Sequence, residues 1–199
     1  MSDPKSMFQM IGADLTPSKL SDATLVLIDC QREYVDGKLP LDGVNPAMDE
    51  AGRLLVRARN AGTPVIHIQH KGKPGGAFDP DGPGWAIDDR VTPLDGEPVL
   101  PKGMPNSFFG TDLADELEKT GRKELIIVGF MTHVCVSTTA RSAMHKGFRT
   151  TVVADAAATR ALPGATGGVV DAATVHNVAL TELADRFAIV AKSADDIGD

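Results

Sequence analysis

Continuous apolar segments alternate with amphipathic segments along most of the chain. A run that is apolar on both faces is typical of a strand buried within a parallel sheet, so each such run predicts one strand. The runs lie at residues 24–29, 64–68, 98–100, 125–129, 150–155 and 187–190, of which 98–100 is the shortest. Apolar positions that recur every three or four residues predict helices between them, most clearly over 45–61.

Five or six strands, each separated by a helix or a long crossover, predict an α/β fold with a doubly wound parallel sheet and helices on both faces. We expect a single domain over residues 1–199. The mixed polar residues 1–22 are interpreted as an N-terminal arm. Residues 71–97 are rich in glycine and proline and predict a long loop, which we interpret as a substrate or interface loop because long ordered loops are usually functional.

Composition and net charge exclude several classes of function. The 199 residues are 42% hydrophobic and carry a net charge of −7, which argues against non-specific nucleic-acid binding. No apolar run approaches the ~20 residues of a membrane span. The first residues lack a basic region followed by an apolar stretch, so we expect no secretory signal and a cytoplasmic protein. Two cysteines, Cys30 and Cys135, without paired Cys or His spacing predict neither a disulfide framework nor a zinc site.

Three reactive side chains follow predicted strands, at the sheet edge where doubly wound folds bind ligands. Asp29 ends the first strand, Lys102 follows the short strand, and Cys135 follows the strand 125–129 through a turn. Each alone is commonplace, but together they suggest a nucleophile, a charge stabiliser and a general base. A cysteine at a helix N-terminus beside an ammonium is expected to have a lowered pKa, and a nearby carboxylate can accept its proton.

The segment around Cys135 resembles a known family. The residues GFMTHVCVSTTAR at 129–141 are similar to the nucleophile segment of the isochorismatase-like cysteine hydrolases. This family includes nicotinamidases, N-carbamoylsarcosine amidohydrolases, and ureidoacrylate and biuret hydrolases. The resemblance extends in order over nearly the whole chain, through LVLIDCQREY at 25–34, GEPVLPKGMPNSFFGTDL at 96–113, VVADAAATR at 152–160 and VHNVALTELADRFAIV at 175–190.

The resemblance implies a six-stranded parallel sheet in a three-layer αβα sandwich, assembled as a homodimer or homotetramer. It implies that Asp29, Lys102 and Cys135 form a catalytic triad, in which the thiolate attacks an amide or carbamoyl carbon and a thioester is then hydrolysed. It further implies an oxyanion hole made by the backbone N–H groups of Met131 and Cys135, and a cis peptide bond between Phe130 and Met131.

The resemblance to nicotinamidases stops at their metal site, which uses an aspartate and histidines. The segment 35–43 offers Asp36 and Asp42 without a histidine, so we expect no metal and no other cofactor. The predicted function is therefore metal-independent cleavage of a C–N bond in a small amide, carbamoyl or ureido compound. Two alternatives stay open: isochorismatase-type vinyl ether hydrolysis with Asp29 as general acid, and a catalytically idle family member.

Several further residues are candidate contacts for the small-molecule substrate. Gln69 and His70 end the strand 64–68, and Phe78 and Trp85 lie in the loop 71–97. His133 stands two residues before Cys135. Packing is the alternative for the two aromatic residues. For His133, a structural role or a position at the rim of the substrate pocket is favoured over a Cys–His dyad with Cys135. We expect neither nucleic acid nor a membrane as a partner.

Overall fold

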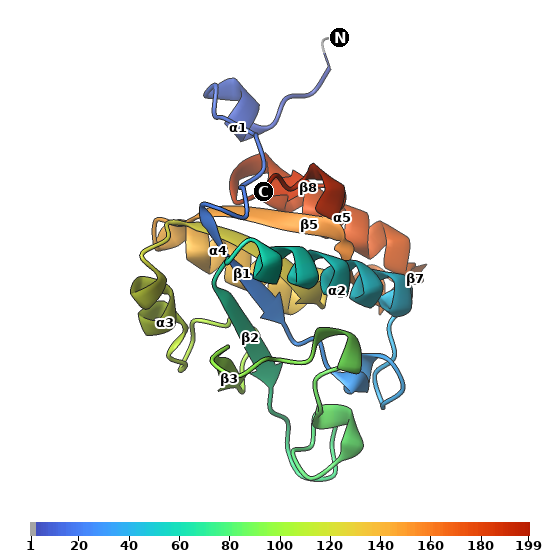
Figure 1. Ribbon diagram of the computed structural model, residues 1–199. Helices are drawn as coiled ribbons and strands as arrows, with labels where there is room; N and C mark the ends of the chain where they lie inside the picture. The colour runs from blue at the N-terminus through green and yellow to red at the C-terminus, as the bar shows by residue number, and fades with distance from the viewer. Residues whose placement is uncertain (1–2) are drawn as a thin grey trace.

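The central sheet contains six parallel strands in the order β3-β2-β1-β4-β5-β8 (Figure 1), in a computed structural model that describes residues 3–199. The strands are β1 (Ala23–Ile28), β2 (Val65–His70), β3 (Val99–Lys102), β4 (Glu124–Phe130), β5 (Arg149–Ala158) and β8 (Ile189–Ala191). Each coincides with one of the apolar runs, which confirms the predicted parallel sheet.

Helices cover both faces of this sheet: α2 (Val44–Asn60), α3 (Leu113–Thr120), α4 (Ser137–His145) and α5 (Ala172–Arg186). Successive side chains of a strand point to opposite faces. Leu25 and Leu27 accordingly pack in the core beneath α2, whereas Val26 and Ile28 pack in the core shared by α3, α4 and α5. The layers and the doubly wound topology predicted from the sequence are confirmed.

Two helix starts differ from the sequence-based prediction. The last helix, expected from about Gly168, begins at Ala172 and is capped by Asp171, whose side chain accepts a hydrogen bond from the Thr174 N–H at 2.8 Å. The preceding residues instead form a small antiparallel hairpin of β6 (Leu162–Pro163) and β7 (Val169–Val170).

The helix expected from about Cys135 also begins later. Cys135 lies in a π-helical turn, Thr132–Val136, and α4 starts only at Ser137. We call Thr132–Val136 the nucleophile turn. Hydrophobic spacing does not distinguish a π-helical turn from the first turn of an α-helix, because both bury side chains about once per turn.

A close approach of β1 and β4 prepares the carboxyl edge of the sheet. Gly129 has a φ of +113°, and a Cβ atom there would lie 2.0 Å from the carbonyl oxygen of Ile28. Only glycine permits this contact. The pairing of β4 with β5 also shifts register here, because Ile127 pairs with Val152 whereas Gly129 pairs with Ala157. The chain therefore leaves β4 beside the end of β1.

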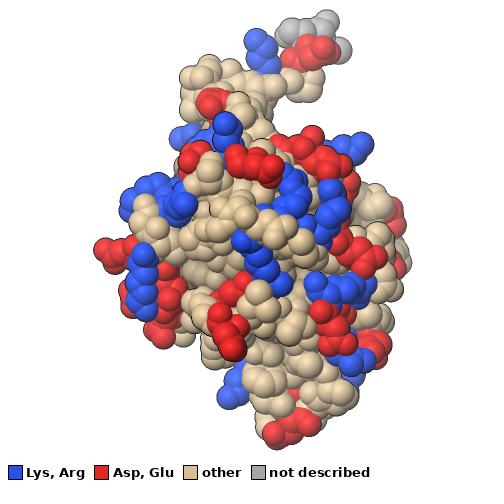
Figure 2. Space-filling model, viewed as in Figure 1, with Lys and Arg blue, Asp and Glu red and all other residues tan. Residues whose placement is uncertain are grey.

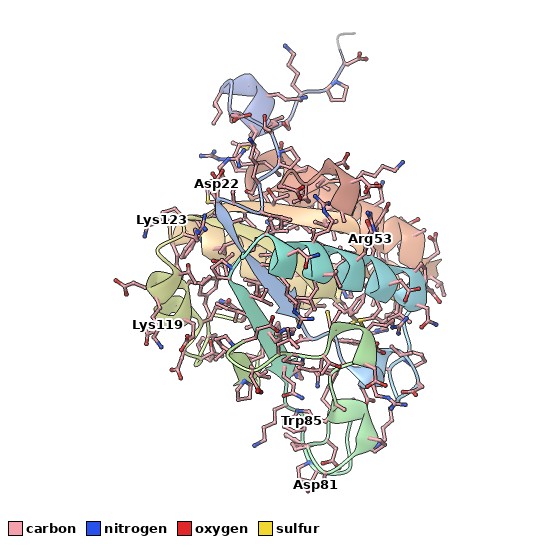
Figure 3. The ribbon with its side chains drawn as sticks, in the orientation of Figure 1. Asp22, Arg53, Asp81, Trp85, Lys119 and Lys123 are labelled. Carbon is pink, nitrogen blue, oxygen red and sulfur yellow. The ribbon has the colours of Figure 1, made fainter. Side chains whose placement is uncertain are left out.

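The two segments assigned as irregular contain little regular secondary structure. In the arm, the short helix α1 (Met7–Met10) buries no residue and projects from the sheet (Figure 1). The loop 71–97 contains two 3₁₀ turns, at Pro83–Trp85 and Asp89–Val91, and an isolated β-bridge between Ile87 and Gln31. Figure 3 labels Asp81 and Trp85 within this loop. Acidic and basic side chains are interspersed over the face seen in Figure 2. No helix within residues 3–199 is long and apolar enough to cross a membrane.

Candidate active site

Asp29, Lys102 and Cys135 lie together at the carboxyl end of the sheet. Nζ of Lys102 is 2.7 Å from Oδ2 of Asp29 and 3.3 Å from Sγ of Cys135. All three residues are buried, with exposed fractions of 0% for Asp29, 2% for Lys102 and 4% for Cys135. An ammonium in contact with both a carboxylate and a sulfur favours negative charge on either of them.

Three neighbouring strands place these groups. Asp29 directly follows β1 and adopts a left-handed φ of +51°, which turns the chain out of the strand. Lys102 is the last residue of β3. Cys135 belongs to the nucleophile turn, which follows β4. Because all strands are parallel, their carboxyl ends meet at one edge, and distant parts of the sequence converge there.

Burial dominates the protonation of the thiol. The pKa of Cys135 rises to about 12, because loss of solvation and the charge of Asp29 raise it more than Lys102 lowers it. The pKa of Asp29 is also raised, because its burial outweighs the opposing charge of Lys102. The lowered thiol pKa expected from the sequence is therefore wrong in direction. At neutral pH the resting site contains a thiol, beside a carboxyl group whose affinity for a proton is increased.

His70 adds a fourth polar group to this cluster. Its Nδ1 is 3.1 Å from Nζ of Lys102, and its ring meets the ring of Phe78 edge-on at 4.9 Å between centroids. Burial and then the charge of Lys102 lower the pKa of His70 to about 4, so the imidazole is neutral at physiological pH. Of the candidate substrate contacts, His70 is the one in direct contact with Lys102.

The other candidate contacts occupy more peripheral positions. The side-chain amide of Gln69 donates to the carbonyl of Trp85 at 2.9 Å, so it holds the loop 71–97 against β2. Phe78 is buried and packs edge-on against Tyr34 at 5.0 Å. Trp85 is half-buried against the core beneath α2. The role of these residues in substrate binding stays a prediction.

His133 does not form a dyad with the neighbouring cysteine. Its Nδ1 lies 2.6 Å from Oγ1 of Thr159, which is located after β5. Burial and then the charge of Arg160 lower the pKa of His133, so this imidazole is neutral as well. Its hydrogen bond ties the nucleophile turn to the segment after β5, in agreement with the structural role favoured from the sequence.

The two backbone positions expected to bind an oxyanion flank the same turn. The peptide bond between Phe130 and Met131 is cis, as the resemblance implies. Met131 immediately precedes the nucleophile turn, and Cys135 lies within it. The use of their N–H groups as an oxyanion hole stays a prediction.

Gln31 is a residue beside this cluster that the sequence analysis did not single out. It is fully buried, and its side chain accepts a hydrogen bond from the His70 N–H at 2.7 Å and donates to the His70 carbonyl at 3.0 Å. The same amide donates to the carbonyl of Trp85 at 2.8 Å. Gln31 therefore clamps the end of β2 and the loop 71–97 together. Its position two residues after Asp29 was the available signal.

One group of potential metal ligands occurs among residues 3–199. The ligand atoms of Asp29, His70 and Cys135 lie within 4.8 Å of one another. Nζ of Lys102 contacts all three, at 2.7, 3.1 and 3.3 Å respectively. A zinc ion at bonding distances of about 2.0–2.3 Å would have to displace this ammonium. The positive charge at the centre of these donors is therefore supplied by lysine.

The two aspartates of segment 35–43 lie apart from that group. Asp36 is exposed and pairs with Arg32 at 2.6 Å. Asp42 forms an isolated β-bridge with Thr159. Neither side chain belongs to the group of close potential ligands.

Comparison with known proteins places this chain in a family. A family model described as the isochorismatase domain matches residues 23–195, a range that contains Asp29, Lys102 and Cys135. The chain belongs to the isochorismatase family of hydrolases. The resemblance noted in the sequence is thereby confirmed for the family and the fold.

Two named proteins and one crystal structure illustrate how similar this chain is to other members of the family. Isc1, a secreted isochorismatase effector of Verticillium dahliae, is 39% identical over 191 residues, which are 96% of this chain and 98% of that protein. Maleamate amidohydrolase of Pseudomonas putida is 34% identical over 146 residues, 65% of this chain and 68% of that protein. The crystal structure of an isochorismatase from Pseudomonas putida KT2440 superposes with a TM-score of 0.93 at 44% identity, covering 98% and 100% of the two chains.

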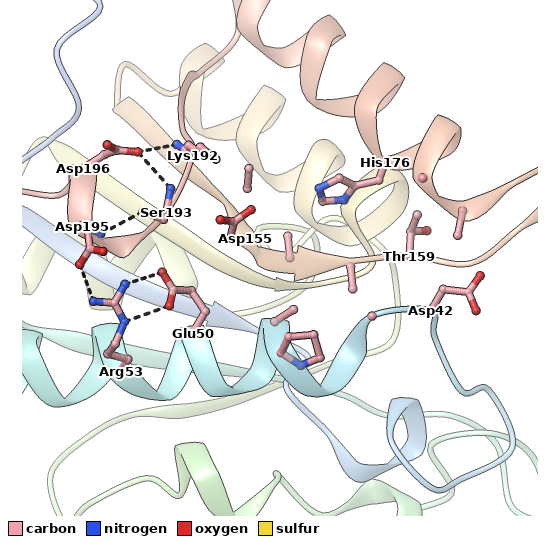
Figure 4. Close-up of a pocket in the computed structure, with 18 residues that line it drawn as sticks. Asp42, Glu50, Arg53, Asp155, Thr159, His176, Lys192, Ser193, Asp195 and Asp196 are labelled. Atoms are coloured by element: carbon pink, nitrogen blue, oxygen red, sulfur yellow. Dashed lines mark hydrogen bonds and ion pairs between the residues drawn. The ribbon is translucent and has the colours of Figure 1, made fainter.

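A separate groove lies behind the nucleophile turn, between α2, the carboxyl half of β5 and α5 (Figure 4). Its volume is about 940 Å³, and its lining includes no triad residue. Arg53 bridges Glu50 and Asp195 along one wall, at 2.7 and 2.5 Å. The groove is open to solvent and several charged side chains line it, whereas the triad residues are buried. We therefore base the chemistry on the triad rather than on this groove.

Two side chains of the groove wall support the nucleophile turn. Nδ1 of His176 is 2.9 Å from Oγ1 of Thr132, and Thr159 contacts His133 as described above. His176 and Thr159 both line the groove. The pKa of His176 is lowered by its burial, which outweighs the charge of Asp155. The turn is thus held from behind by neutral hydrogen bonds.

Proposed function

We propose that this hydrolase cleaves a carbon–nitrogen bond of a small amide, carbamoyl or ureido compound through a thioester on Cys135, without a metal ion. The observation that carries the proposal is the contact of one buried ammonium, Lys102, with both Asp29 and Cys135. An amidohydrolase among the relatives supports cleavage of an amide.

The raised pKa values define how the nucleophile is activated. With a thiol pKa of about 12, almost no thiolate exists at neutral pH. The Cys135 proton therefore moves to Asp29 as sulfur attacks the carbonyl carbon, and Lys102 stabilises the developing negative charge. The C–S bond forms while the carbonyl oxygen becomes an oxyanion, for which the N–H groups of Met131 and Cys135 are the proposed donors.

The same proton then serves the leaving group. Asp29 returns it to the substrate nitrogen, the C–N bond breaks, and ammonia or an amine departs. Water attacks the remaining thioester while Asp29 accepts one of its protons. Collapse of the second tetrahedral intermediate breaks the C–S bond and releases the acid. Proton transfer from Asp29 restores the thiol, so atoms and charges balance over the cycle.

A panel of small amides, carbamoyl and ureido compounds tests this proposal by ammonia or amine release. Addition of hydroxylamine during turnover should divert the thioester to a hydroxamate, and mass spectrometry should detect the acyl group on Cys135. The Cys135→Ala variant is the control for both readouts. Absence of turnover across the panel, together with absence of an acylated cysteine, would contradict the proposal.

Chelation tests the metal-independent part separately. We expect EDTA to leave activity unchanged, because the ammonium of Lys102 supplies the positive charge beside the reacting groups. Activity that is lost to the chelator and restored by zinc, iron or manganese would contradict this and would favour a nicotinamidase-type site.

Isochorismate hydrolysis is the second candidate, because Isc1, similar over nearly the whole chain, is named an isochorismatase. In this reaction Asp29, whose raised pKa favours the protonated form, would donate a proton to the vinyl ether. The two reactions differ in whether they need the thiol of Cys135. Isochorismate cleavage that survives Cys135→Ala would favour this candidate over amide hydrolysis.

Alkylation by iodoacetamide distinguishes either of the two proposed activities from a catalytically idle family member. In a functional site, iodoacetamide should alkylate Cys135 well before it alkylates Cys30. Cys30 is buried, and burial and the charge of Asp29 raise the pKa of its thiol. Equal and slow labelling of both cysteines in the folded protein would favour the idle alternative.

A further inference from the structure

Lys102 has three N–H donors, and three atoms that can accept a hydrogen bond lie within 3.3 Å of its Nζ. Besides Oδ2 of Asp29 and Sγ of Cys135, its Nζ lies 3.1 Å from Nδ1 of His70. With 2% of its surface exposed, Lys102 has little access to water. An unpaired N–H on a buried ammonium is costly, so the third acceptor matters for the placement of the whole group.

We propose that His70 is a positioning residue of this active site: as a neutral imidazole it accepts the third hydrogen bond of Lys102 and thereby directs the other two donors to Asp29 and Cys135. This inference rests on the proposed function only where turnover is concerned. It goes beyond the triad, because His70 acts through Lys102 and contacts no reacting atom.

The sheet itself aligns the two side chains. His70 and Lys102 are paired residues of the neighbouring parallel strands β2 and β3. Paired residues of adjacent strands project to the same face, so the imidazole and the ammonium meet without a special loop. Gln31 holds the backbone of His70 through two hydrogen bonds, and Phe78 contacts the ring edge-on. Backbone and ring are therefore both restrained.

The protonation state follows from the donor. Because the ammonium can only donate, Nδ1 of His70 must carry a lone pair, and the ring proton is on Nε2. The titratable groups that face His70 are Lys102 from β3, Asp29 from the end of β1 and Cys135 from the nucleophile turn. Burial and the charge of Lys102 keep the pKa of His70 at about 4.

A neutral acceptor suits this chemistry better than a charged one. A carboxylate at this position would place a second negative charge beside Cys135 and further raise its pKa. A protonated imidazole would repel Lys102. Without any acceptor, the ammonium would turn toward water or another partner, and its contact with the sulfur would weaken.

Iodoacetamide alkylation of Cys135 provides a test that needs no substrate. We expect His70→Leu, which retains bulk and removes the acceptor, to slow alkylation at about pH 8 by about 10- to 100-fold, the range for a hydrogen bond to a charged group. In His70→Asn the amide oxygen can replace Nδ1, so the rate should stay within about threefold of the wild type. For turnover, kcat should fall in the leucine variant with little change in KM.

His67→Leu is the matched control on the same strand. His67 is buried and contacts Glu97 at 3.1 Å, on the other face of β2 from His70. This substitution should lower the melting temperature while leaving Cys135 alkylation unchanged. Equal alkylation rates for wild type and His70→Leu, or an equal loss in His67→Leu, would overturn the inference.

Nitrogen NMR reads the protonation of His70 in the wild-type protein itself, and a variant is used only to assign the signals. With histidine labelled, the His70 signals, assigned from their absence in His70→Asn, should show a bare Nδ1 and a protonated Nε2 from about pH 5.5 to 8. A protonated Nδ1, or titration near the ordinary histidine pKa, would overturn the inference. If no compound of the panel is hydrolysed but these readouts behave as expected, the proposed function fails and the positioning role stands.

Discussion

The front and the back of the nucleophile turn are built differently. At the front, Cys135 is 4% exposed and lies against an ion pair, Asp29 with Lys102, from which water is excluded. At the back, Thr132 and His133 are held by neutral hydrogen bonds next to an open groove of about 940 Å³. The front therefore concentrates charge in a medium of low polarity, whereas the back only orients the backbone.

This difference explains why the open groove is not where we place the chemistry. Electrostatic interactions strengthen when water is excluded, so a small enclosed set of charges can alter protonation far more than exposed charges can. In the groove, Arg53 has 42% of its side chain exposed and is already paired with Glu50 and Asp195. Substitutions at the front should therefore change the reaction, and those at the back should change it much less.

The largest effect is expected from the nucleophile itself. Cys135→Ser should lower amide turnover by about 10⁴-fold or more, because the thiol cannot be replaced without loss of the covalent step. Cys30→Ala is the matched control, since Cys30 is equally buried but packs in the core beneath α2. Its turnover should stay within about threefold of the wild type. Turnover and melting temperature of both variants check this, and comparable losses of turnover would contradict it.

The next effect concerns the proton acceptor. Asp29→Asn should lower kcat/KM by about 10²-fold or more, because both proton transfers depend on this carboxyl group. As a base, Asp29 must be ionised, so activity should be lost as pH falls through its pKa. Because that pKa is raised, the loss should begin at a higher pH than for an ordinary aspartate, whose value is 3.8. A kcat/KM profile that falls only below this ordinary value would contradict the assignment.

Substitutions behind the turn should have a smaller effect. His176→Ala and His133→Ala each remove one neutral hydrogen bond to the turn and should lower kcat by about three- to tenfold. Steady-state kinetics of these two variants, measured together with Asp29→Asn, compare the losses in kcat. If His133→Ala proves the more damaging, a Cys–His pair replaces the proposed triad.

The smallest effect is expected in the groove wall. Arg53→Ala removes ion pairs with Glu50 and Asp195, which are partly exposed and therefore weakened by solvent and salt. The free energy of unfolding should fall by less than about 1 kcal/mol, and turnover should not change. Denaturant unfolding at low and high salt measures this. A loss of turnover greater than that of His176→Ala would indicate that the groove takes part in catalysis.

The sequence predicted the fold because the central strands β1 and β4 are buried on both faces, whereas the edge strand β3 is largely exposed. The run that became β1 is apolar except for Thr24, and all six residues of the strand are buried in the structure. The candidate triad could also be predicted from the sequence, since Asp29, Lys102 and Cys135 each follow such a run and parallel strands end at one edge. Helix starts were harder to predict from the sequence: Asp171 caps a helix that the apolar pattern placed from about Gly168.

The sequence by itself determined that Asp29, Lys102 and Cys135 belong to the carboxyl edge of the sheet, because apolar runs separated by crossovers predict parallel strands whose carboxyl ends share one edge. The order of those strands was decided by the tertiary structure. Only the tertiary structure decided their protonation, because the pKa of Cys135 depends on lost solvation and on the distance to Asp29, which no spacing encodes. It also decided the role of His70, because the pairing of this residue with Lys102 depends on the register between β2 and β3. Residues far apart in the chain acquire a shared electrostatic environment only when the sheet has formed.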